Sequence, residues 1–394
     1  MNKKTFKNID VNGKRVLVRV DYNVPLGEKG EILDDTRIVA SLPTITYLLN
    51  NHAKIILCSH LGRPKGNFNT ALSLKPVAER LSNLLNREVK LATDVIGESA
   101  KNLVDNMQEG DIVMLENVRF HKEEEENDEE FAKKLASFAD VFVLDAFGTS
   151  HRAHASTAGV ARFIPAVAGF LVAKEITEID KVMQKPERPV LVIFGGKKVS
   201  DKIGVITSML DLASTILIGG AMAFTFIVAK GGEVGLSRYE KDKIEVAKEI
   251  LRLADCKNVK IVLPVDSVVA REFSPKARSK VVNSFKIPAG FQSMDIGPKT
   301  IRLFKSEIKK AKTVIWNGPM GVYEFKKFKK GTDAIAKAIA VSGSTSIVGG
   351  GDSAAAVLSS GYASRITHIS TGGGATLEYL EGKNLPGVAM LEDK

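Results

Sequence analysis

Cysteine is scarce in this chain of 394 residues, which contains only Cys58 and Cys256. Two cysteines cannot build a disulfide framework, and these two do not have the spacing of metal ligands. Cys58 lies within an apolar strand pattern, where we expect it to be a small core residue. The cysteine usage therefore favours a reducing compartment, and we predict a cytoplasmic location.

Long hydrophobic runs are absent as well. No apolar run is long enough to span a bilayer, and the first residues, MNKKTFKNID, lack the apolar stretch of a signal peptide. The apolar share of 44% and the charged share of 26% are those of a globular protein. A chain of this length exceeds one ordinary core, so two or three domains and no membrane partner are expected.

Aromatic residues make up only 6% of the chain, although its formal net charge is +10. The positive surplus favours anionic partners such as phosphorylated metabolites, nucleotides or nucleic acid. The best candidate for a basic-aromatic patch is EFKKFKKG at residues 324–331. The spacing of its two phenylalanines is, however, typical of side chains that face a core while the lysines face water. Because no RNP, KH or zinc-finger pattern is present, nucleic acid is not expected as the main partner.

Familiar catalytic signatures are also missing. The segment GGKKVSDK, residues 195–202, follows an apolar strand and opens a helix, but it lacks the spacing of a Walker A loop. The sequence contains no His-Arg-Asp catalytic loop, no Asp-Phe-Gly and no Gly-x-Ser-x-Gly elbow. A protein kinase is therefore excluded, and no nucleophile with an adjacent base stands out.

Two charged clusters have structural interpretations. The run EEEENDEE at residues 123–130 is predicted to be a solvated acidic helix face. His151 and His154 lie three residues apart, but Arg152 stands between them and no third ligand is near in the sequence. This pair does not predict a metal site.

One unit recurs along the chain: a short β-branched run, a loop, and ten or more residues of helical period. The strand candidates are residues 15–20, 54–58, 111–115 and 141–145 in the first half and residues 189–194, 214–218, 259–263, 313–316, 345–348 and 366–370 in the second. Such alternation predicts parallel sheets covered on both faces. We expect an α/β fold of two doubly wound, mostly parallel, Rossmann-like domains, joined by a helical hinge at residues 166–184.

The segments that follow the strands differ between the two halves. Ligands of open α/β sheets bind beyond the carboxyl ends of the strands. In the first half these ends carry DYNVP, SHLGRP, ENVRFH and DAFGTSHR; in the second they carry GGKK, GGAM, PVD, NGPMG, GGGDS and TGGG. Converging arginines suit a small, dense anion, whereas glycines at helix starts suit the phosphates of a nucleotide. Two domains with two anionic ligands are predicted.

The residues also suggest a type of reaction. If a phosphoryl group moves between the two ligands onto a carboxylate, no base is needed, because the acceptor is already an anion. Catalysis then depends on positioning and on cations that neutralise the phosphoryl oxygens, for which the lysines of GGKK and one of the arginines are candidates. Asp352, at the mouth of GGGDS, is a candidate magnesium ligand.

A series of motifs resembles the successive signatures of the phosphoglycerate kinase family. In order, they are RVDYNVP, DDTR, SHLGRP, ENVRF, DAFGTSHRAHAS, GGKKVSDK, WNGPMGVYE, VGGGDS and TGGGATLEYLEGK, from near residue 15 to near residue 383. The resemblance implies a monomeric two-domain phosphotransferase with a carboxyl group as acceptor. Its reaction, in glycolysis and gluconeogenesis, would be reversible phosphoryl transfer between 1,3-bisphosphoglycerate and ADP, giving 3-phosphoglycerate and MgATP.

The resemblance places the glycerate ligand on a first domain of residues 1–165 with 376–394. There it implies that Asp21 and Asn23 hold the hydroxyl and carboxyl end of the glycerate, and that Arg37 stabilises the transition state beside the moving phosphoryl group. The basic patch around the stable phosphate would consist of His60, Leu61, Gly62, Arg63, Arg119 and Arg152.

The resemblance places ATP or ADP, with Mg²⁺, on a second domain of residues 185–375. Lys198 would follow the transferring phosphoryl group, Lys202 would bind the nucleotide phosphates, and Glu324 would bind the ribose. The backbone N–H groups of Gly373 and Gly374 would face the phosphoryl group in flight. The remaining nucleotide contacts would be Gly219, Gly220, Asn317, Gly350, Gly351, Asp352 and Ser353, with Asp352 on the magnesium ion.

Two positions depart from the usual pattern of the family. Lys197 stands where the family usually has alanine, and no role is assigned to it; Tyr22 replaces a common phenylalanine, and we expect its hydroxyl to find water or a loop partner. Two alternatives stay open from the sequence alone. One is another acyl-phosphate-forming kinase with a different carboxylate acceptor, and the other is a basic protein that binds nucleic acid or a surface on this scaffold.

Overall fold

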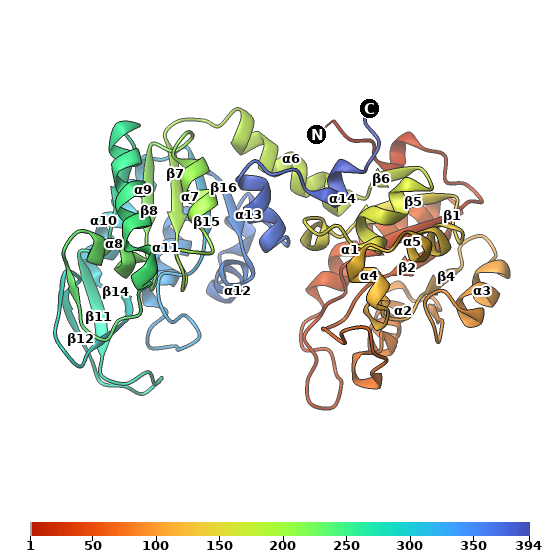
Figure 1. Cartoon of the computed structure of the whole chain (residues 1–394), viewed down its shortest axis with the longest axis horizontal. Helices are drawn as coiled ribbons and strands as arrows, with labels where there is room; N and C mark the ends of the chain where they lie inside the picture. Colours follow the sequence, from red (N-terminus) through yellow and green to blue (C-terminus); the bar gives the residue numbers. More distant parts are fainter. Residues whose placement is uncertain (1) are drawn as a thin grey trace. The chain divides into compact units, whose positions relative to one another are not determined.

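The computed structural model describes residues 2–394, which form two compact units (Figure 1). The first unit runs to Thr177 and takes up the chain again from Asn384 to its end, and the second runs from Glu178 to Lys383. Each unit is built on a six-stranded sheet in which all neighbouring strands are parallel. The predicted α/β fold with two parallel sheets is confirmed.

The sheet of the first unit has the strand order β3-β4-β2-β1-β5-β6. Its strands are β1 (Arg15–Val20), β2 (Lys54–Cys58), β3 (Lys90–Leu91), β4 (Ile112–Met114), β5 (Val141–Asp145) and β6 (Ala166–Ala168). The four runs predicted in this half coincide with β1, β2, β4 and β5. The pattern did not indicate β3 or β6, because neither is long enough to show a strand period.

Helices pack on this sheet and share its core with the strands. They are α1 (Thr36–Asn50), α2 (Lys75–Leu85), α3 (Glu98–Asp105), α4 (Lys122–Glu126), α5 (Glu129–Ala136) and α14 (Pro386–Ala389), with short 3₁₀ or π turns at Phe6–Asn8, Thr70–Leu72, Val118–Phe120, Phe147–Thr149, Ala155–Gly159 and Val160–Arg162. The fully buried side chains of Val18 and Leu57 pack with Ile45 of α1 and Leu81 of α2. The strands β1, β2, β4 and β5 are therefore buried along nearly all of their length.

The acidic run at residues 123–130 is not one solvated helix face, as the sequence predicted. It is divided between α4 and α5 at Asn127, whose φ of 55° is left-handed. Within α4 the side chain of Glu124 is fully buried. The prediction was wrong here because a row of four glutamates carries no periodic signal that marks one of them as internal.

The sheet of the second unit has the order β10-β8-β7-β15-β16-β17. Its strands are β7 (Val190–Phe194), β8 (Thr215–Ile218), β10 (Lys260–Val262), β15 (Thr313–Asn317), β16 (Thr345–Gly349) and β17 (His368–Ile369), and all six coincide with predicted runs. An antiparallel sheet that the pattern did not indicate joins β11 (Asp266–Ala270), β12 (Ser279–Asn283) and β14 (Gln292–Ile296), and β9 (Glu233–Val234) pairs with β13 (Lys286–Ile287).

The helices of the second unit surround a core that includes Trp316 and Phe304, both fully buried. They are α7 (Ile203–Met209), α8 (Ala223–Ala229), α9 (Ile244–Cys256), α10 (Pro298–Lys310), α11 (Lys330–Ala340), α12 (Gly351–Ser360) and α13 (Gly374–Leu380), with 3₁₀ turns at Lys241–Lys243 and Ala363–Arg365. Among residues 2–394, no helix is both long and apolar enough to cross a membrane.

The connecting helix α6 (Phe170–Gln184) carries the chain across the division after Thr177. It begins later than the predicted stretch 166–184, because Ala166–Ala168 pair with β5 as β6. The Asp145 carboxylate accepts the N–H of Leu171 at 2.9 Å and so anchors the start of the helix.

The chain returns to the first unit later than the predicted residue 376. Residues up to Lys383 stay with the second unit, where Ser208 Oγ donates to the carbonyl of Glu381 at 3.1 Å. Both chain ends lie in the first unit, and the N–H of Lys394 donates to the carbonyl of Asn2 at 2.9 Å (Figure 1).

Candidate active site

Each parallel sheet has one point where the strand order reverses. In the first unit β1 lies between β2 and β5, and in the second β7 lies between β8 and β15. The loops that leave the two strands on either side of the reversal point run to opposite faces of the sheet. In open α/β sheets, ligands usually bind between these loops, at the carboxyl ends of the strands. The predicted site residues follow these strands and their neighbours.

In the first unit, Asp21 and Arg37 form an ion pair at this point. Arg37 Nη1 lies 2.7 Å from Asp21 Oδ2, and Arg37 comes from the first turn of α1. Asp21 Oδ1 also accepts the N–H of Asn23 at 3.2 Å. Asn23 Oδ1 in turn accepts the N–H of Gly62 at 2.9 Å. These bonds join the segment after β1, the start of α1 and the turn after β2.

The turn after β2, residues 60–64, is held by two residues that follow β4. Asn117 accepts the N–H of Leu61 at 3.2 Å and donates to its carbonyl at 2.7 Å. Arg119 Nη1 donates to the carbonyl of Gly62 at 2.9 Å. Gly62 has a φ of 62°, a conformation that L side chains rarely adopt. The turn therefore presents backbone groups, while Arg63 is exposed in it.

His60 lies buried in the same turn, with arginines around it. Burial holds its pKa well below the usual value, and the positive charges of Arg19, Arg119, Arg37 and Arg152 lower it further. His60 is therefore neutral, and the positive charge of this region belongs to the arginines. Of the predicted basic residues, Arg37, Arg119, Arg152 and His60 are thus brought together.

Sequence reasoning missed a buried layer that touches these residues. Arg19 is 1% exposed although it is charged, and it lies within β1 between two buried valines. Its guanidinium contacts His60 and Ser156. The signal that could have found it is a single charge inside an apolar strand, because such a charge has to be paired.

Tyr22 also has a partner different from the one expected. Its hydroxyl lies 2.8 Å from Ser41 Oγ of α1, neither a water nor a loop residue. Ser41 Oγ bonds in addition to the carbonyl of Ile38 at 2.8 Å. Burial raises the pKa of the Tyr22 phenol, so the hydroxyl stays protonated.

In the second unit, Lys202 lies at the reversal point. Its ammonium donates to the carbonyl of Gly195 at 2.7 Å and to that of Asn317 at 3.1 Å, which follow β7 and end β15. Burial lowers the pKa of Lys202 to about 8, against the raising influence of Asp352 and Asp201. The predicted phosphate-binding lysine is therefore a buried cation between two backbone carbonyls.

The glycines around Lys202 pack against other backbone. A Cβ atom at Gly195 would lie 2.2 Å from the carbonyl oxygen of Pro319, and one at Gly220 would lie 2.5 Å from the nitrogen of Gly196. A Cβ atom at Gly219 would lie 2.5 Å from Met320 Sδ. Close packing alone therefore accounts for these three glycines, whatever ligand their N–H groups meet.

Asn317 and Ser353 tie the loop after β15 to the start of α12. Asn317 Nδ2 donates to the carbonyl of Gly349 at 2.8 Å, and Ser353 Oγ accepts the N–H of Gly318 at 2.5 Å. Gly350 precedes α12 with a φ of 94°, which favours glycine, and Gly351 is the first residue of the helix. This turn aims the N-terminus of α12 at the same strand ends as Lys202.

Several of the predicted residues of the second unit lie at the surface. Lys198 and Glu324 are exposed, and the loop of Lys198 is anchored by Glu240, whose carboxylate accepts the N–H of Ser200 at 3.0 Å. Gly374 begins α13 after Gly373, whose φ is 52°.

Asp352 is the candidate metal ligand. It is exposed at the start of α12 and accepts the Tyr323 hydroxyl at 3.4 Å. Residues 2–394 contain no group of three or more His, Cys, Asp and Glu side chains that could hold a metal ion. A single carboxylate fits Mg²⁺ that is bound mainly by nucleotide phosphates and water.

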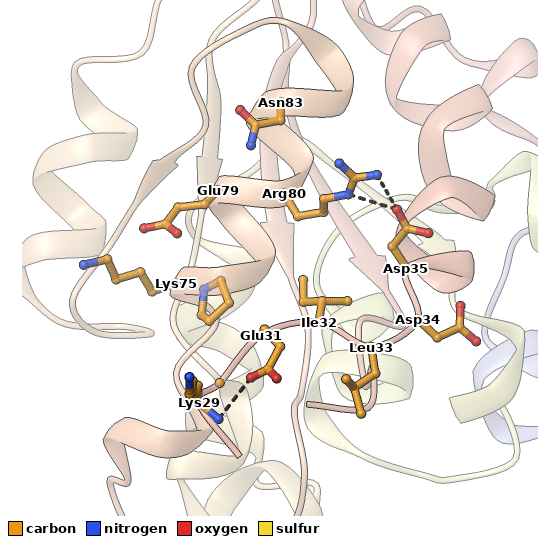
Figure 2. A pocket seen from close by; sticks show the side chains of 12 residues that line it. Lys29, Glu31, Ile32, Leu33, Asp34, Asp35, Lys75, Glu79, Arg80 and Asn83 are labelled. Carbon is orange, nitrogen blue, oxygen red and sulfur yellow. Dashed lines mark hydrogen bonds and ion pairs between the residues drawn. The ribbon is translucent and has the colours of Figure 1, made fainter. Parts of the chain in front are cut away.

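A separate groove in the first unit lies between residues 29–35 and α2 (Figure 2). Arg80 crosses it to Asp35, with Nε at 2.9 Å and Nη2 at 2.7 Å from Oδ2. Lys29, Lys75, Glu31 and Glu79 give its walls charges of both signs. None of the lining residues belongs to the predicted site, and the mixed charge selects no class of ligand.

Comparisons with known proteins point to the same family as the series of motifs. The family model described as phosphoglycerate kinase matches residues 6–383. Phosphoglycerate kinase of Clostridium tetani is 53% identical over 396 aligned positions, which cover 100% of this chain and 98% of the relative. That of Clostridium botulinum (strain Langeland) is 54% identical and covers 100% and 99%.

Solved structures give the same result. Phosphoglycerate kinase from Coxiella burnetii superposes with a TM-score of 0.89 at 40% identity, with 98% of each chain covered. That from Pyrococcus horikoshii superposes with a TM-score of 0.87 at 34% identity, with the same coverage. The chain belongs to the phosphoglycerate kinase family, and it is a phosphotransferase with a carboxyl group as acceptor. Neither a different carboxylate acceptor nor a non-enzymatic role is favoured.

Proposed function

We propose that, in this member of the phosphoglycerate kinase family, the first unit binds 3-phosphoglycerate or 1,3-bisphosphoglycerate and the second binds ATP or ADP with Mg²⁺. The observation that carries the proposal is the contrast between two strand ends of equal topology. Four arginines surround a neutral His60 in one unit, and a buried Lys202 lies among glycine backbone in the other. The first suits a compact anion and the second a polyphosphate.

On the glycerate side, we propose that the arginines bind the two anionic ends of the ligand. Arg119 and Arg152, with His60 and the backbone of Leu61 and Gly62, would bind the stable phosphate. Asp21 would accept a hydrogen bond and Asn23 would donate one through its amide, at the end of the glycerate that carries the hydroxyl and carboxyl groups. Arg63, exposed in the same turn, would reach the phosphate from outside.

Arg37 would stabilise the charge that develops during transfer. Its side chain is 39% exposed, so the guanidinium keeps free N–H groups beyond those that face Asp21. An arginine that is held by a carboxylate needs little reorganisation when the phosphoryl group arrives, which favours the transition state. The acceptor carboxylate is already charged, and the transfer needs no general base and no covalent enzyme intermediate.

On the nucleotide side, Lys202 has a donor to spare. An ammonium group has three N–H donors, and two of those of Lys202 face backbone carbonyls. The third would bind a phosphate oxygen, together with N–H groups of Gly350, Gly351 and Ser353 at the positive end of α12. Asn317 would hold the loop, Glu324 would bind the ribose hydroxyls, and Gly219 and Gly220 would line the adenine slot.

Mg²⁺ would be held by Asp352 and would neutralise charge on the phosphates. Lys198 and the N–H groups of Gly373 and Gly374 would meet the phosphoryl group in transfer. The two ligands have to meet without water, and we propose that α6 forms part of a hinge for that closure. Solution scattering that shows no compaction with both ligands bound would contradict the hinge.

We also propose a monomer in a reducing cytoplasm. The free thiol of Cys58 is buried, and its burial raises the pKa of the thiol to about 12, which suits a structural role rather than disulfide exchange. Light scattering after gel filtration would give the mass of the particle, and a mass near twice 42.6 kDa would contradict the monomer.

A coupled assay tests the proposed roles of the lysines. MgATP and 3-phosphoglycerate would be turned over, and the product would be followed by NADH oxidation through glyceraldehyde-phosphate dehydrogenase. Lys198→Ala should lower kcat about 100-fold, as for the loss of one preorganised cation. The matched control is Lys197→Ala, which removes an exposed neighbouring charge and should change kcat less than about threefold. Equal losses in both variants would contradict the role of Lys198.

A further inference from the structure

A layer of buried polar side chains lies beneath the proposed glycerate site. Its members are Arg19 of β1, Glu124 of α4 and Ser156 of the turn at 155–159, which are 1%, 0% and 0% exposed. Buried charges are costly unless they are paired and hydrogen-bonded. The way in which these groups pair therefore constrains the residues above them.

The direction of each hydrogen bond in this layer follows from the donor inventory. Glu124 Oε2 accepts the N–H of Ser156 at 2.8 Å, and Oε1 accepts its hydroxyl at 2.6 Å. Because that hydroxyl has one proton and gives it to Glu124, Ser156 Oγ can only accept the Nε–H of Arg19, at 2.8 Å. Both carboxylate oxygens of Glu124 therefore act as acceptors, and Arg19 is oriented by Ser156.

The positive partner of Glu124 is Arg19 and not a nearby histidine. His154 Nδ1 lies 3.8 Å from Glu124 Oε1, too far for a hydrogen bond. Burial, together with the positive charges of Arg119 and Arg152, lowers the pKa of His154 to about 4. His154 is therefore neutral near pH 7, and the negative charge of Glu124 is compensated through Ser156 by the guanidinium.

The other end of Arg19 determines the state of His60. Arg19 Nη2 lies 3.1 Å from His60 Nδ1. A guanidinium can only donate, so Nδ1 has to be an unprotonated acceptor, and the single ring proton of neutral His60 lies on Nε2. The other charges that face His60 are Arg37 of α1, Arg119 after β4 and Arg152 after β5, and all of them oppose a second proton.

We propose that Glu124 is a positioning residue, which acts through Ser156 and Arg19 to keep His60 neutral with its proton on Nε2, as a donor to the phosphate of the glycerate ligand. The proposal rests on the proposed glycerate site. It assigns the attraction of the ligand to the arginines and gives His60 a directional role. A charged histidine among four arginines would add repulsion before the ligand arrives, whereas a neutral N–H adds a hydrogen bond without that cost.

The first test measures His60 itself in the unmodified, ligand-free chain. Long-range proton–nitrogen correlation spectra of ¹⁵N-histidine protein distinguish the two neutral tautomers and the charged ring. The chain has six histidines, and His60→Gln would assign the signal. We expect the Nε2–H tautomer from about pH 5 to about pH 8, where an ordinary histidine titrates. A proton on Nδ1, or a titration within that interval, would overturn the proposal.

The second test breaks the layer at two points. Ser156→Ala removes the hydroxyl that accepts from Arg19. Glu124→Gln replaces one accepting oxygen by an amide NH2 group, although the N–H and the hydroxyl of Ser156 both donate to this side chain. Both variants should give His60 a mixture of tautomers and raise KM for 3-phosphoglycerate about tenfold, with kcat and KM for ATP changed less than about threefold. Glu126→Gln, the matched control, removes an exposed carboxylate from the same helix and should change neither.

The outcomes separate this proposal from the glycerate site on which it rests. If both variants fold, as judged by thermal unfolding, and leave the His60 signal unchanged, the positioning role is overturned. If the signal changes in them but His60→Gln leaves KM for 3-phosphoglycerate unchanged, the proposed contact of His60 with the ligand is wrong. A variant that does not fold leaves the tautomer of the unmodified chain as the deciding result.

Discussion

The two units share one architecture but equip the carboxyl ends of their strands in opposite ways. In the first unit the strand ends carry Asp21, His60, Arg119 and Arg152, and side-chain hydrogen bonds hold several of them in place. In the second unit the strand ends are glycines in backbone contact, with Lys202 tied to carbonyls. The shared topology favours a ligand at the strand ends of both units, and we propose that the residue types there determine its class.

The difference also indicates how each site fails. A site built from side chains loses one contact with its ligand for each side chain that is truncated. A crevice built from backbone tolerates changes around it but not a Cβ atom within it, because its walls cannot move independently of the strands. The four predictions that follow test this contrast in order of decreasing effect.

Arg37→Ala should have the largest effect. Because Arg37 is proposed to neutralise charge that develops during transfer, kcat should fall by at least about 100-fold, as for other preorganised donors. The control is Arg80→Ala, since Arg80 pairs with Asp35 in the same unit and its side chain is 43% exposed, against 39% for Arg37. Steady-state kinetics that show similar kcat values for both variants would refute the role of Arg37.

Gly195→Ala should damage the second unit through its backbone. The new methyl group would lie 2.2 Å from the carbonyl of Pro319, so the strand ends have to shift, at a cost of about 1–3 kcal/mol in unfolding free energy. KM for ATP should rise about tenfold, a weakening equivalent to about 1.4 kcal/mol. Denaturant unfolding and steady-state kinetics give the two values.

Gly343→Ala is the control for that change. Gly343 has a φ of 70° but nothing within 4 Å of a Cβ atom, and it precedes β16 at the opposite end of the sheet. It should lose only about 1 kcal/mol of stability through backbone strain and keep KM for ATP. A loss of nucleotide affinity in this variant as well would mean that stability, and not the geometry of the crevice, limits binding.

The pH dependence should differ between the two ligands. The buried ammonium of Lys202 has a pKa of about 8, below the usual value for lysine, so its charge is lost as the pH rises through 8 in the ligand-free chain. KM for ATP should therefore rise about tenfold from about pH 7 to about pH 9, because one unit above a pKa leaves about a tenth of the group protonated.

Lys202→Arg sharpens this prediction, since an arginine stays charged throughout the interval. Its KM for ATP should be higher at about pH 7, because the guanidinium does not fit the space of the ammonium, but it should be flat up to about pH 9. The same inflection in the variant would assign the titration to another group. KM for 3-phosphoglycerate should lack the inflection in both proteins.

Tyr22→Phe should have the smallest effect. It removes the hydroxyl that lies 2.8 Å from Ser41 Oγ, but Ser41 keeps its bond to the carbonyl of Ile38. Unfolding free energy should fall by about 1 kcal/mol, the net value of one buried hydrogen bond. Thermal unfolding would measure it, and a loss above about 3 kcal/mol would show that Tyr22 supports more than this one contact.

The sequence predicted the strands of both parallel sheets because their buried residues form continuous β-branched runs. It did not predict β12, which is mostly exposed and therefore has no such run. It also misplaced the start of α6, because Ala166–Ala168 are small residues that fit a helical pattern equally well. Short or exposed elements acquire their structure from neighbours that are distant in the chain.

The site shows the same limit. The resemblance of the motifs to a known family indicated Asp21, Arg37 and Lys202 as site residues. Nothing in four consecutive glutamates distinguishes Glu124, whose burial depends on Ser156, 32 positions further along the chain. Nor could the pattern separate glycines that pack from glycines proposed to bind. Gly219 is a proposed adenine contact, and a Cβ atom on it would lie 2.5 Å from Met320 Sδ.

Binding measured one ligand at a time tests most directly that each unit holds its own anion. Titration calorimetry of 3-phosphoglycerate and of MgADP would be carried out on the unmodified chain, Arg152→Ala and Lys202→Met. We expect Arg152→Ala to weaken the binding of 3-phosphoglycerate at least about tenfold and to leave the binding of MgADP unchanged. Lys202→Met should weaken the binding of MgADP and leave that of 3-phosphoglycerate unchanged. If either variant weakened both ligands equally, or the other unit's ligand more, the division of labour between the units would be contradicted.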